Sequence, residues 1–150
     1  MGTPTEIVFR KMIPADVDAV NKLDEKCFGG DAWSLAFLIS EVKNPHCKYL
    51  VGEVDGKIIA CAGIEIFSDE AEMTTFAVAP EFQGRGLGKR LLEETICLAK
   101  KFGATSMIFE VRCSNIPALH VYQKFGFRKI GRIKNYYYDS EDALTMGGEI

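Results

Sequence analysis

The chain has 150 residues, of which 47% are hydrophobic and 26% are charged, and its formal net charge is −3. This length and balance predict a single soluble domain spanning 1–150, and the weak negative charge argues against direct binding to nucleic acid, which takes a clustered basic face. Because no apolar run is long enough to span a membrane and the first ten residues lack the apolar stretch of a signal peptide, we expect a cytoplasmic protein with no membrane partner.

The first half of the chain has the hydrophobic periodicity of one strand, two helices and a hairpin. The predicted elements are a strand at 7–12, a helix opened by Pro14 and Asp16 with Val17, Val20, Leu23 and Phe28 on one face, a helix from 33–34 to 44–45 with Phe37, Leu38 and Val42 as its apolar stripe, and strands at 49–54 and 57–67. Ser34 is a typical N-cap for the second helix. Asp55-Gly56 is a strong signal for a tight turn, so the two strands should pair antiparallel.

The second half alternates strands and helices. The predicted elements are a strand at 72–78 ended by Pro80, a helix at 86–102 carrying Leu87, Leu91, Leu92, Ile96, Leu98 and Ala99 on its apolar side, a strand at 107–111, a helix from Pro117 with Ala118, Val121, Tyr122 and Phe125, and strands at 127–138 and 143–146. This order predicts the α+β class, with the helices packed around one mixed sheet.

The cysteines predict neither a disulfide framework nor a metal site. They are odd in number, contain no C-x-x-C pair, and the two histidines lie far apart in the sequence. Cys61 and Cys97 lie in apolar runs and are interpreted as small core residues. Cys113 lies closer to the candidate chemistry below, but no spacing places a histidine beside it as a partner for nucleophilic catalysis.

A glycine-rich stretch at the junction of a strand and a helix predicts a phosphate-binding turn. Its residues are Gln83, Gly84, Arg85, Gly86, Leu87 and Gly88, followed by the cationic Lys89 and Arg90. Glycines let the backbone approach a ligand closely, and the free N–H groups of the helix's first turn attract phosphate. The spacing fits neither a P-loop nor a dinucleotide fingerprint.

This stretch resembles the pyrophosphate loop of the GNAT acetyltransferase superfamily, Q/R-x-x-G-x-G/A. The resemblance implies acetyl-CoA as cosubstrate, and it implies the GNAT fold, a mostly antiparallel mixed sheet of about seven strands flanked by about four helices. It also implies that Phe76-Ala77-Val78, just before the loop, is the strand whose main chain pairs with the pantetheine arm.

The segment 110–127 resembles the E-V-R-x-S-N-x-x-A-x-x-x-Y-x-x-x-G-F signature of RimI-type N-terminal acetyltransferases, and with other matches the resemblance covers nearly the whole chain. It implies that Glu110 is the general base, directly or through water, that Tyr122 is the general acid near the sulfur, and that Asn115 contacts acetyl-CoA.

The same residues have simpler interpretations when taken alone. Glu110 lies in an apolar strand, where an unpaired carboxylate is costly, so it faces a cleft or pairs with Arg112 or Lys48. Tyr122 has the spacing of a core aromatic, and Asn115 can cap a helix. His120, two positions before Tyr122, should point away from it as a surface residue.

The resemblance implies that the acceptor is an amine, for which the leading prediction is a protein N-terminus. A small amine or a lysine side chain is the alternative, and a non-catalytic acyl-CoA-binding module is another. Trp33, Tyr136 and Tyr137 are predicted to line the acceptor cleft, or else to pack in the core. The sequence departs from the RimI pattern at Gly29-Gly30-Asp31 and after Tyr137, both near the expected acceptor. An oligomer is possible.

Overall fold

The computed structural model describes residues 6–150, so residues 1–5 of the predicted domain, and half of the stretch examined for a signal peptide, lie outside the described part. The helices and strands are β1 (Val8–Lys11), α1 (Val17–Phe28), α2 (Leu35–Lys43), β2 (Cys47–Val54), β3 (Lys57–Phe67), β4 (Glu70–Val78), α3 (Leu87–Lys101), β5 (Ser106–Arg112), α4 (Ile116–Lys124), β6 (Arg128–Ile133) and β7 (Ala143–Glu149). Short 3-10 turns lie at η1 (Pro14–Asp16), η2 (Gly29–Asp31) and η3 (Pro80–Phe82).

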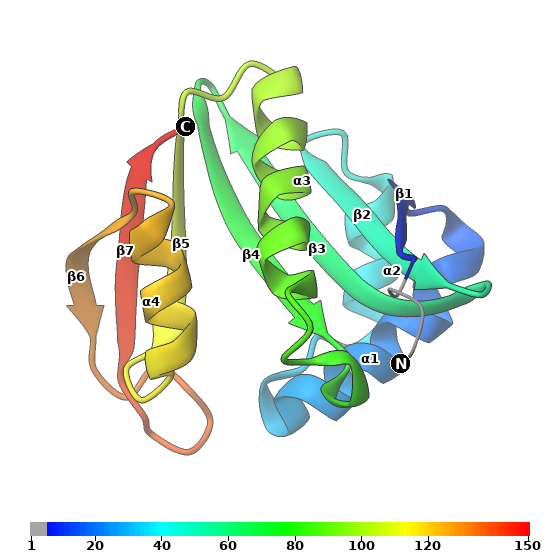
Figure 1. Ribbon diagram of the computed structural model, residues 1–150, viewed down its shortest axis with the longest axis horizontal. Helices are drawn as coiled ribbons and strands as arrows, with labels where there is room; N and C mark the ends of the chain where they lie inside the picture. The colour runs from blue at the N-terminus through cyan, green and yellow to red at the C-terminus, as the bar shows by residue number, and fades with distance from the viewer. Residues whose placement is uncertain (1–5) are drawn as a thin grey trace.

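The seven strands form one sheet in the order β1-β2-β3-β4-β5-β7-β6. Neighbouring strands are antiparallel except for β4 and β5, which are parallel. Helices α3 and α4 cover one face of the sheet, and α1 and α2 cover the other (Figure 1). The α+β class and the mostly antiparallel sheet are therefore confirmed.

Local signals in the sequence account for several element boundaries. The Ser34 hydroxyl accepts a hydrogen bond from the Phe37 N–H at 3.1 Å, which caps α2 as predicted. Asp55 and Gly56 both have positive φ, 51° and 77°, as the tight turn between β2 and β3 requires. These two features confirm the predicted helix start and hairpin.

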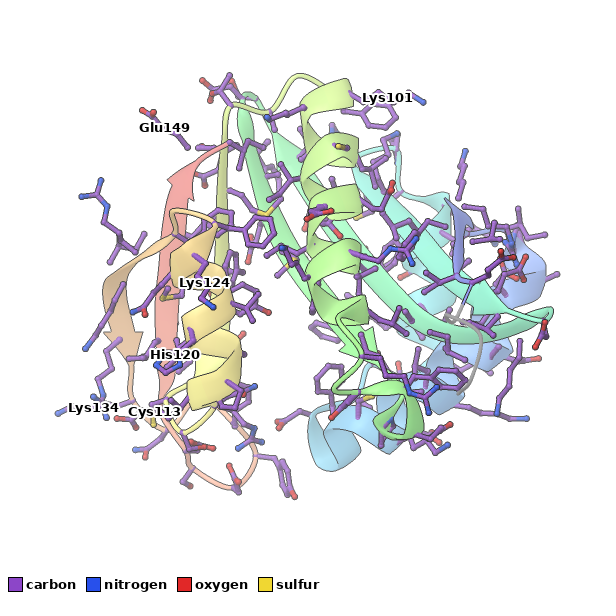
Figure 2. All side chains as sticks on the ribbon, in the orientation of Figure 1. Lys101, Cys113, His120, Lys124, Lys134 and Glu149 are labelled. Carbon is purple, nitrogen blue, oxygen red and sulfur yellow. The ribbon has the colours of Figure 1, made fainter. Side chains whose placement is uncertain are left out.

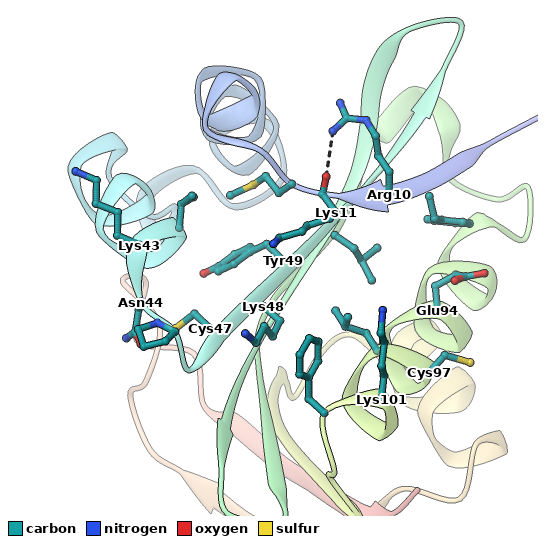
Figure 3. Close-up of a pocket in the computed structure, with 17 residues that line it drawn as sticks. Arg10, Lys11, Lys43, Asn44, Cys47, Lys48, Tyr49, Glu94, Cys97 and Lys101 are labelled. Atoms are coloured by element: carbon teal, nitrogen blue, oxygen red, sulfur yellow. Dashed lines mark hydrogen bonds between the residues drawn. The ribbon is translucent and has the colours of Figure 1, made fainter.

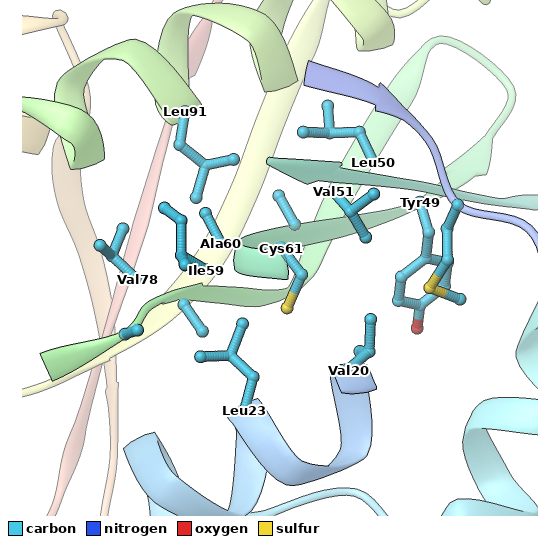
Figure 4. Close-up of a cluster of buried hydrophobic side chains, with 14 of the residues drawn as sticks. Val20, Leu23, Tyr49, Leu50, Val51, Ile59, Ala60, Cys61, Val78 and Leu91 are labelled. Carbon is cyan, nitrogen blue, oxygen red and sulfur yellow. The ribbon is translucent and has the colours of Figure 1, made fainter. Parts of the chain in front are cut away.

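The core consists of two hydrophobic clusters. The first joins α1 and α2 to β1–β4 and the start of α3, and it includes Val20, Leu23 and the fully buried Cys61 (Figure 4). The second joins α3, α4 and parts of β3 and β4 to β5 and β7, and it contains Phe109 and Phe127, which are almost completely buried. Cys61 is thus a core residue, as predicted.

Three details of the sequence interpretation are wrong. The strand predicted at 127–138 ends at Ile133, because Asn135 takes φ 54° and its N–H donates to Asp142 at 3.0 Å, which turns the chain out of the sheet. Cys97 is exposed on α3 rather than buried. Phe37 is 37% exposed and stacks on Trp33 instead of facing the core with Leu38.

Two irregularities in β4 shape the middle of the sheet. Strands β4 and β5 pair only over Glu70–Glu72 and Ser106–Ile108, after which they diverge (Figure 1). On its other side β4 has a bulge at Thr74, because Met73 and Thr75 pair with consecutive residues of β3. A bulge bends its strand. The stretch after Thr74 therefore has a backbone edge that β5 does not cover.

Candidate functional site

The glycine-rich turn has the geometry of an anion site at the start of α3. Gly84 and Gly86 have φ of 77° and 78°, a conformation that disfavours other residues, and Gly86 is the N-cap of α3. The first hydrogen bond of the helix runs from the Arg90 N–H to the Gly86 carbonyl, so the N–H groups of the preceding turn have no partner within the helix. These groups can receive a phosphate.

Space is available above this turn. A Cβ built at Gly84, Gly86 or Gly88 would meet no heavy atom within 4 Å. Gln83 fixes the turn to the end of β4, because its side-chain amide donates to the Val78 carbonyl at 2.9 Å. The turn residues fit the pyrophosphate that the GNAT resemblance implies. Lys89 is exposed in the first turn of α3, and Arg85 donates to the Glu81 carbonyl at 3.1 Å.

The uncovered edge of β4 leads directly to this turn. Phe76, Ala77 and Val78 pair with β3 on one side, and on the other side β5 has already diverged. Their main-chain groups on that side can hydrogen-bond to an extended ligand, as a further strand would. The structure therefore joins the predicted pantetheine strand and pyrophosphate loop into one continuous surface.

Glu110 lies on β5 beside the divergence. It is half-buried, and it forms no hydrogen bond or ion pair with another residue in the 6–150 region. Burial, and then the nearby carboxylate of Glu72, raises the pKa of Glu110 above its ordinary value. An ion pair with Arg112 does not form, because that guanidinium is bound elsewhere. A carboxylate with a raised pKa and no partner is suited to accept a proton near neutral pH.

Tyr122 lies on the opposite face of the sheet from Glu110. It is 7% exposed on α4, and its ring packs 4.5 Å from that of Phe109 and 6.2 Å from that of Phe76. Side chains alternate along a strand, so Glu110 points away from the face on which Phe109 and Tyr122 meet. Burial raises the pKa of Tyr122, which keeps the phenol protonated. The two candidate catalytic groups thus flank the divergence from opposite sides.

The remaining predicted residues lie around these two groups. Asn115 caps α4, since its side-chain oxygen accepts a hydrogen bond from the Ala118 N–H at 3.4 Å. His120 is exposed on α4, as predicted, and Cys113 lies between β5 and α4, where its thiol donates to Glu141 at 3.4 Å (Figure 2).

The aromatic residues are only partly brought together. The rings of Tyr136 and Tyr137 lie 5.0 Å apart, and burial followed by the carboxylates of Glu110 and Glu72 raises the pKa of Tyr136. The charge of Glu110 thus acts on both tyrosines. Trp33 stacks on Phe37 at 4.5 Å, with its ring 37% exposed.

Sequence reasoning missed the group that fixes the loops around Glu110. Arg112 uses one amino group to bind Asp31 at 2.6 Å and the other to bind Asp139 at 2.9 Å and Glu141 at 2.7 Å. Its guanidinium also lies 4.2 Å from the centre of the Tyr137 ring. Hydrogen bonds from Ser114 and Arg112 lower the pKa of Glu141 to about 2, so this partner stays charged.

The two departures from the RimI pattern meet at this network. Asp31, from the first departure, also accepts a hydrogen bond from the Tyr138 N–H at 2.9 Å, and Tyr138 belongs to the second. Gly30 lies so close to the Tyr138 ring that an added Cβ would be 2.9 Å from it. The sequence carries one sign of this network, namely that both segments depart from the RimI pattern. No spacing rule, however, predicts a contact between residues 107 positions apart.

Two further properties apply to the part of the chain that the structure describes. No helix within 6–150 has both the length and the apolar character needed to cross a lipid bilayer. No group of three or more His, Cys, Asp or Glu side chains in this region is arranged to hold a metal ion.

Comparison with known proteins relates these features to a family. The profile of the Acetyltransferase (GNAT) family matches residues 17–127. Over 143 residues, 95% of each chain, the sequence is 38% identical to a Bacillus subtilis (strain 168) protein described provisionally as a ribosomal protein bS18-alanine N-acetyltransferase. It is 35% identical over 138 residues to the N-alpha-acetyltransferase RimI of Mycobacterium tuberculosis, covering 88% of this chain and 85% of that protein.

The solved structures include a close match to the whole fold. The crystal structure of the ribosomal-protein-S18-alanine N-acetyltransferase from Escherichia coli superposes with a TM-score of 0.88 at 29% identity, covering 97% of this chain and 94% of the other.

Proposed function

Because the chain belongs to the GNAT acetyltransferase family and to its RimI-type members, we propose that it transfers the acetyl group of acetyl-CoA to the N-terminal α-amine of a protein. The observation that carries this proposal is the position of Glu110. It is half-buried, has no hydrogen-bond or ion-pair partner among residues 6–150, and lies beside the point where β4 and β5 diverge, with Tyr122 on the opposite face. A thioester lying between the diverging strands β4 and β5 would have Tyr122, the acid, near its sulfur and Glu110, the base, on the side from which the amine attacks.

In this arrangement each side chain moves one proton. Glu110 accepts a proton from the attacking amine, directly or through one water, while the C–N bond forms. Tyr122 donates its phenolic proton to the sulfur as the C–S bond breaks, so free CoA leaves as the thiol. Tyr122 then regains a proton from solvent and Glu110 loses one, which returns the site to its starting state.

Replacing Tyr122 with phenylalanine should lower kcat about 100-fold, the lower end of the range for general acid catalysis. The loss is moderate because a thiolate is already a reasonable leaving group, as the pKa of about 8.5 of the cysteine thiol illustrates. The apolar packing against Phe109 and Phe76 is kept, so the thermal midpoint and the Kd for acetyl-CoA should be nearly unchanged. Steady-state kinetics and calorimetry measure these quantities, and a kcat within threefold of the parent would refute the acid role.

Proton energetics favour an α-amine as the acceptor. An α-amino group has an unperturbed pKa of about 7.7–8.0, against about 10.4 for lysine. Deprotonating lysine at neutral pH therefore costs about 3 kcal/mol more, from 1.36 kcal/mol per pKa unit. A single carboxylate, that of Glu110, is better suited to deprotonating the α-amine, for which this free-energy cost is smaller. The names of the relatives suggest a peptide beginning with alanine as the first acceptor to test.

Two matched peptides test this proposal. The first begins with a free alanine and contains no lysine, and the second has the same length, a blocked N-terminus and one internal lysine. We expect acetylation of the first peptide with the higher kcat/KM at pH 7.5, measured by release of free CoA and by mass spectrometry. Faster acetylation of the lysine peptide would instead assign a lysine acceptor, and turnover of neither peptide would contradict both assignments.

We expect Arg112→Lys to raise KM for the acceptor peptide about tenfold while the Kd for acetyl-CoA stays unchanged. A guanidinium can bind Asp31 on one side and Glu141 on the other, whereas one ammonium cannot hold both loops together. The control is Arg132→Lys, because exposed Arg132 pairs with Asp142 alone among residues 6–150 and such pairs contribute little. Equal acceptor KM values for the two variants would show that the Arg112 network does not position the acceptor.

A further inference from the structure

A second concave region lies away from the acetyl-transfer residues. It is formed by β1, the start of β2, the end of α2 and the last two turns of α3, and Figure 3 shows its lining. Its cavity volume is about 620 Å³, within the range of roughly 300–1,000 Å³ that is typical of small-molecule sites. None of the residues proposed above for acetyl transfer lines it.

The cavity is strongly cationic. Its charged lining residues are Arg10, Lys11, Lys43, Lys48 and Lys101, with a single carboxylate from Glu94. Arg10 is occupied by Asp16 at 2.7 Å and Glu53 at 3.3 Å. The four lysines form no ion pair with any residue of the 6–150 region. Four lysines that form no ion pair within residues 6–150 therefore line one cavity, in a chain whose net charge is −3, although the Lys43 ammonium points away from the other lining residues (Figure 3).

Helix capping explains the position of only two of these lysines. Lys43 and Lys101 stand in the last turns of α2 and α3, where the helix dipole favours cations. Lys11 and Lys48 lie on strands, where no such effect operates. The Lys48 ammonium lies 4.4 Å from the centre of the Phe102 ring, so a cation and an aromatic face stand together in the wall. Mutual repulsion of the four charges would be relieved by a bound anion.

We propose that this cavity binds a small phosphorylated ligand of the nucleoside polyphosphate class. At least two phosphate groups are needed to neutralise four lysines, because each phosphate carries between one and two negative charges near neutral pH. The apolar walls, from Phe9, Leu98 and Phe102, suit the ring of a nucleoside. The site is separate from the pyrophosphate loop, since residues 87–93 of α3 lie between the loop and Glu94, the first cavity residue on that helix, a length of about 10 Å at 1.5 Å per residue.

Calorimetric titration with ATP tests the proposal, using the full chain saturated with acetyl-CoA so that the pyrophosphate loop is occupied. We expect one saturable ATP site, weakened at least tenfold in Lys48→Gln/Lys101→Gln. Lys43→Gln/Lys101→Gln changes two exposed side chains, which keeps the test valid if the first variant fails to fold. The control, Lys22→Gln/Lys124→Gln, removes the same charge at exposed positions outside the cavity and should change the Kd less than twofold.

Simpler probes assign the binding energy to parts of the ligand. Tripolyphosphate should bind with a Kd within about tenfold of that of ATP, whereas adenosine should not bind. Absence of saturable ATP binding, equal weakening in the control variant, or binding of adenosine alone would each overturn the proposal. The measurement requires no acetyl transfer, so its failure is distinct from failure of the proposed function. If Gly88→Val still binds ATP, the ligand lies outside the pyrophosphate loop. If Gly88→Val no longer binds ATP, the proposal of a separate site is wrong.

Discussion

Replacing Glu110 with glutamine should lower kcat about 1,000-fold, within the range that general acid–base groups contribute. Glutamine has the same shape but cannot accept the proton of the attacking amine. Because Glu110 is half-buried and unpaired, the neutral amide should not disturb the strand, and the Kd for acetyl-CoA should stay within twofold. Steady-state kinetics with the alanine peptide give kcat, and calorimetry gives the Kd.

The pH profile separates a catalytic role from a structural one. A base works in its ionised form, so activity should fall as the pH falls through the pKa of Glu110. Burial and Glu72 raise this pKa, which places the acidic limb above the ordinary glutamate value of about 4.3. Glu110→Gln should lack this limb. A variant that kept the parental limb would show that another group is the base.

Glu72→Gln is the matched control for this experiment. Glu72 is a half-buried glutamate on the neighbouring strand, where it pairs with Ile108, and its charge raises the pKa of Glu110. Neutralising Glu72 should therefore shift the acidic limb to lower pH while most of kcat is kept. If Glu72→Gln lost as much activity as Glu110→Gln, the assignment of the base to Glu110 would be wrong.

Gly88→Val should weaken acetyl-CoA binding more than 100-fold while the protein stays folded. An added Cβ at Gly88 meets no atom of the protein within 4 Å, so the branched side chain would occupy the space proposed for the pyrophosphate. Gly88 also lacks the positive φ of Gly86, so valine adds no backbone strain there. Gly88 is therefore a cleaner test than Gly86, where a side chain would strain the backbone.

Gly88→Ala provides the control, because the GNAT loop pattern Q/R-x-x-G-x-G/A accepts alanine at this position. Alanine in place of glycine within a helix should stabilise the fold by about 0.5–1 kcal/mol. We expect nearly normal acetyl-CoA affinity with a slightly higher thermal midpoint. Calorimetry and thermal unfolding check both variants. Unchanged affinity in folded Gly88→Val would contradict the assignment of the loop.

Periodicity and turn chemistry predicted most of the fold, because they act over a few residues. The hairpin at Asp55-Gly56, the N-cap at Ser34 and the strand-to-helix turn at 83–88 all follow from local backbone preferences. The prediction failed where tertiary contacts decide whether a side chain is buried. Cys97 lies in an apolar run, yet it is exposed because that side of α3 faces solvent.

The candidate site was predictable from sequence only in part. The resemblance supplied Glu110, Tyr122 and the loop, but the environment of each depends on distant strands. The raised pKa of Glu110 depends first on burial and then on Glu72, which approaches through a parallel pairing that no local pattern predicts. The Arg112 network likewise joins Asp31, Glu141 and Asp139 from separate loops. Such contacts are properties of the folded chain.

The short pairing between β4 and β5 also bears on how the protein holds together. Only Glu70–Glu72 of β4 pairs with β5, but the second hydrophobic cluster crosses this line, because it packs Met73 of β4 and Leu92 of α3 together with Phe109 of β5. In the proposed complex the cosubstrate lies where β4 and β5 no longer pair, so it adds main-chain contacts that the sheet lacks there. A ligand at 100 times its Kd stabilises the folded state by about 2.7 kcal/mol. The molecule that donates the acetyl group would therefore also stabilise the fold, and release of product would remove that contribution.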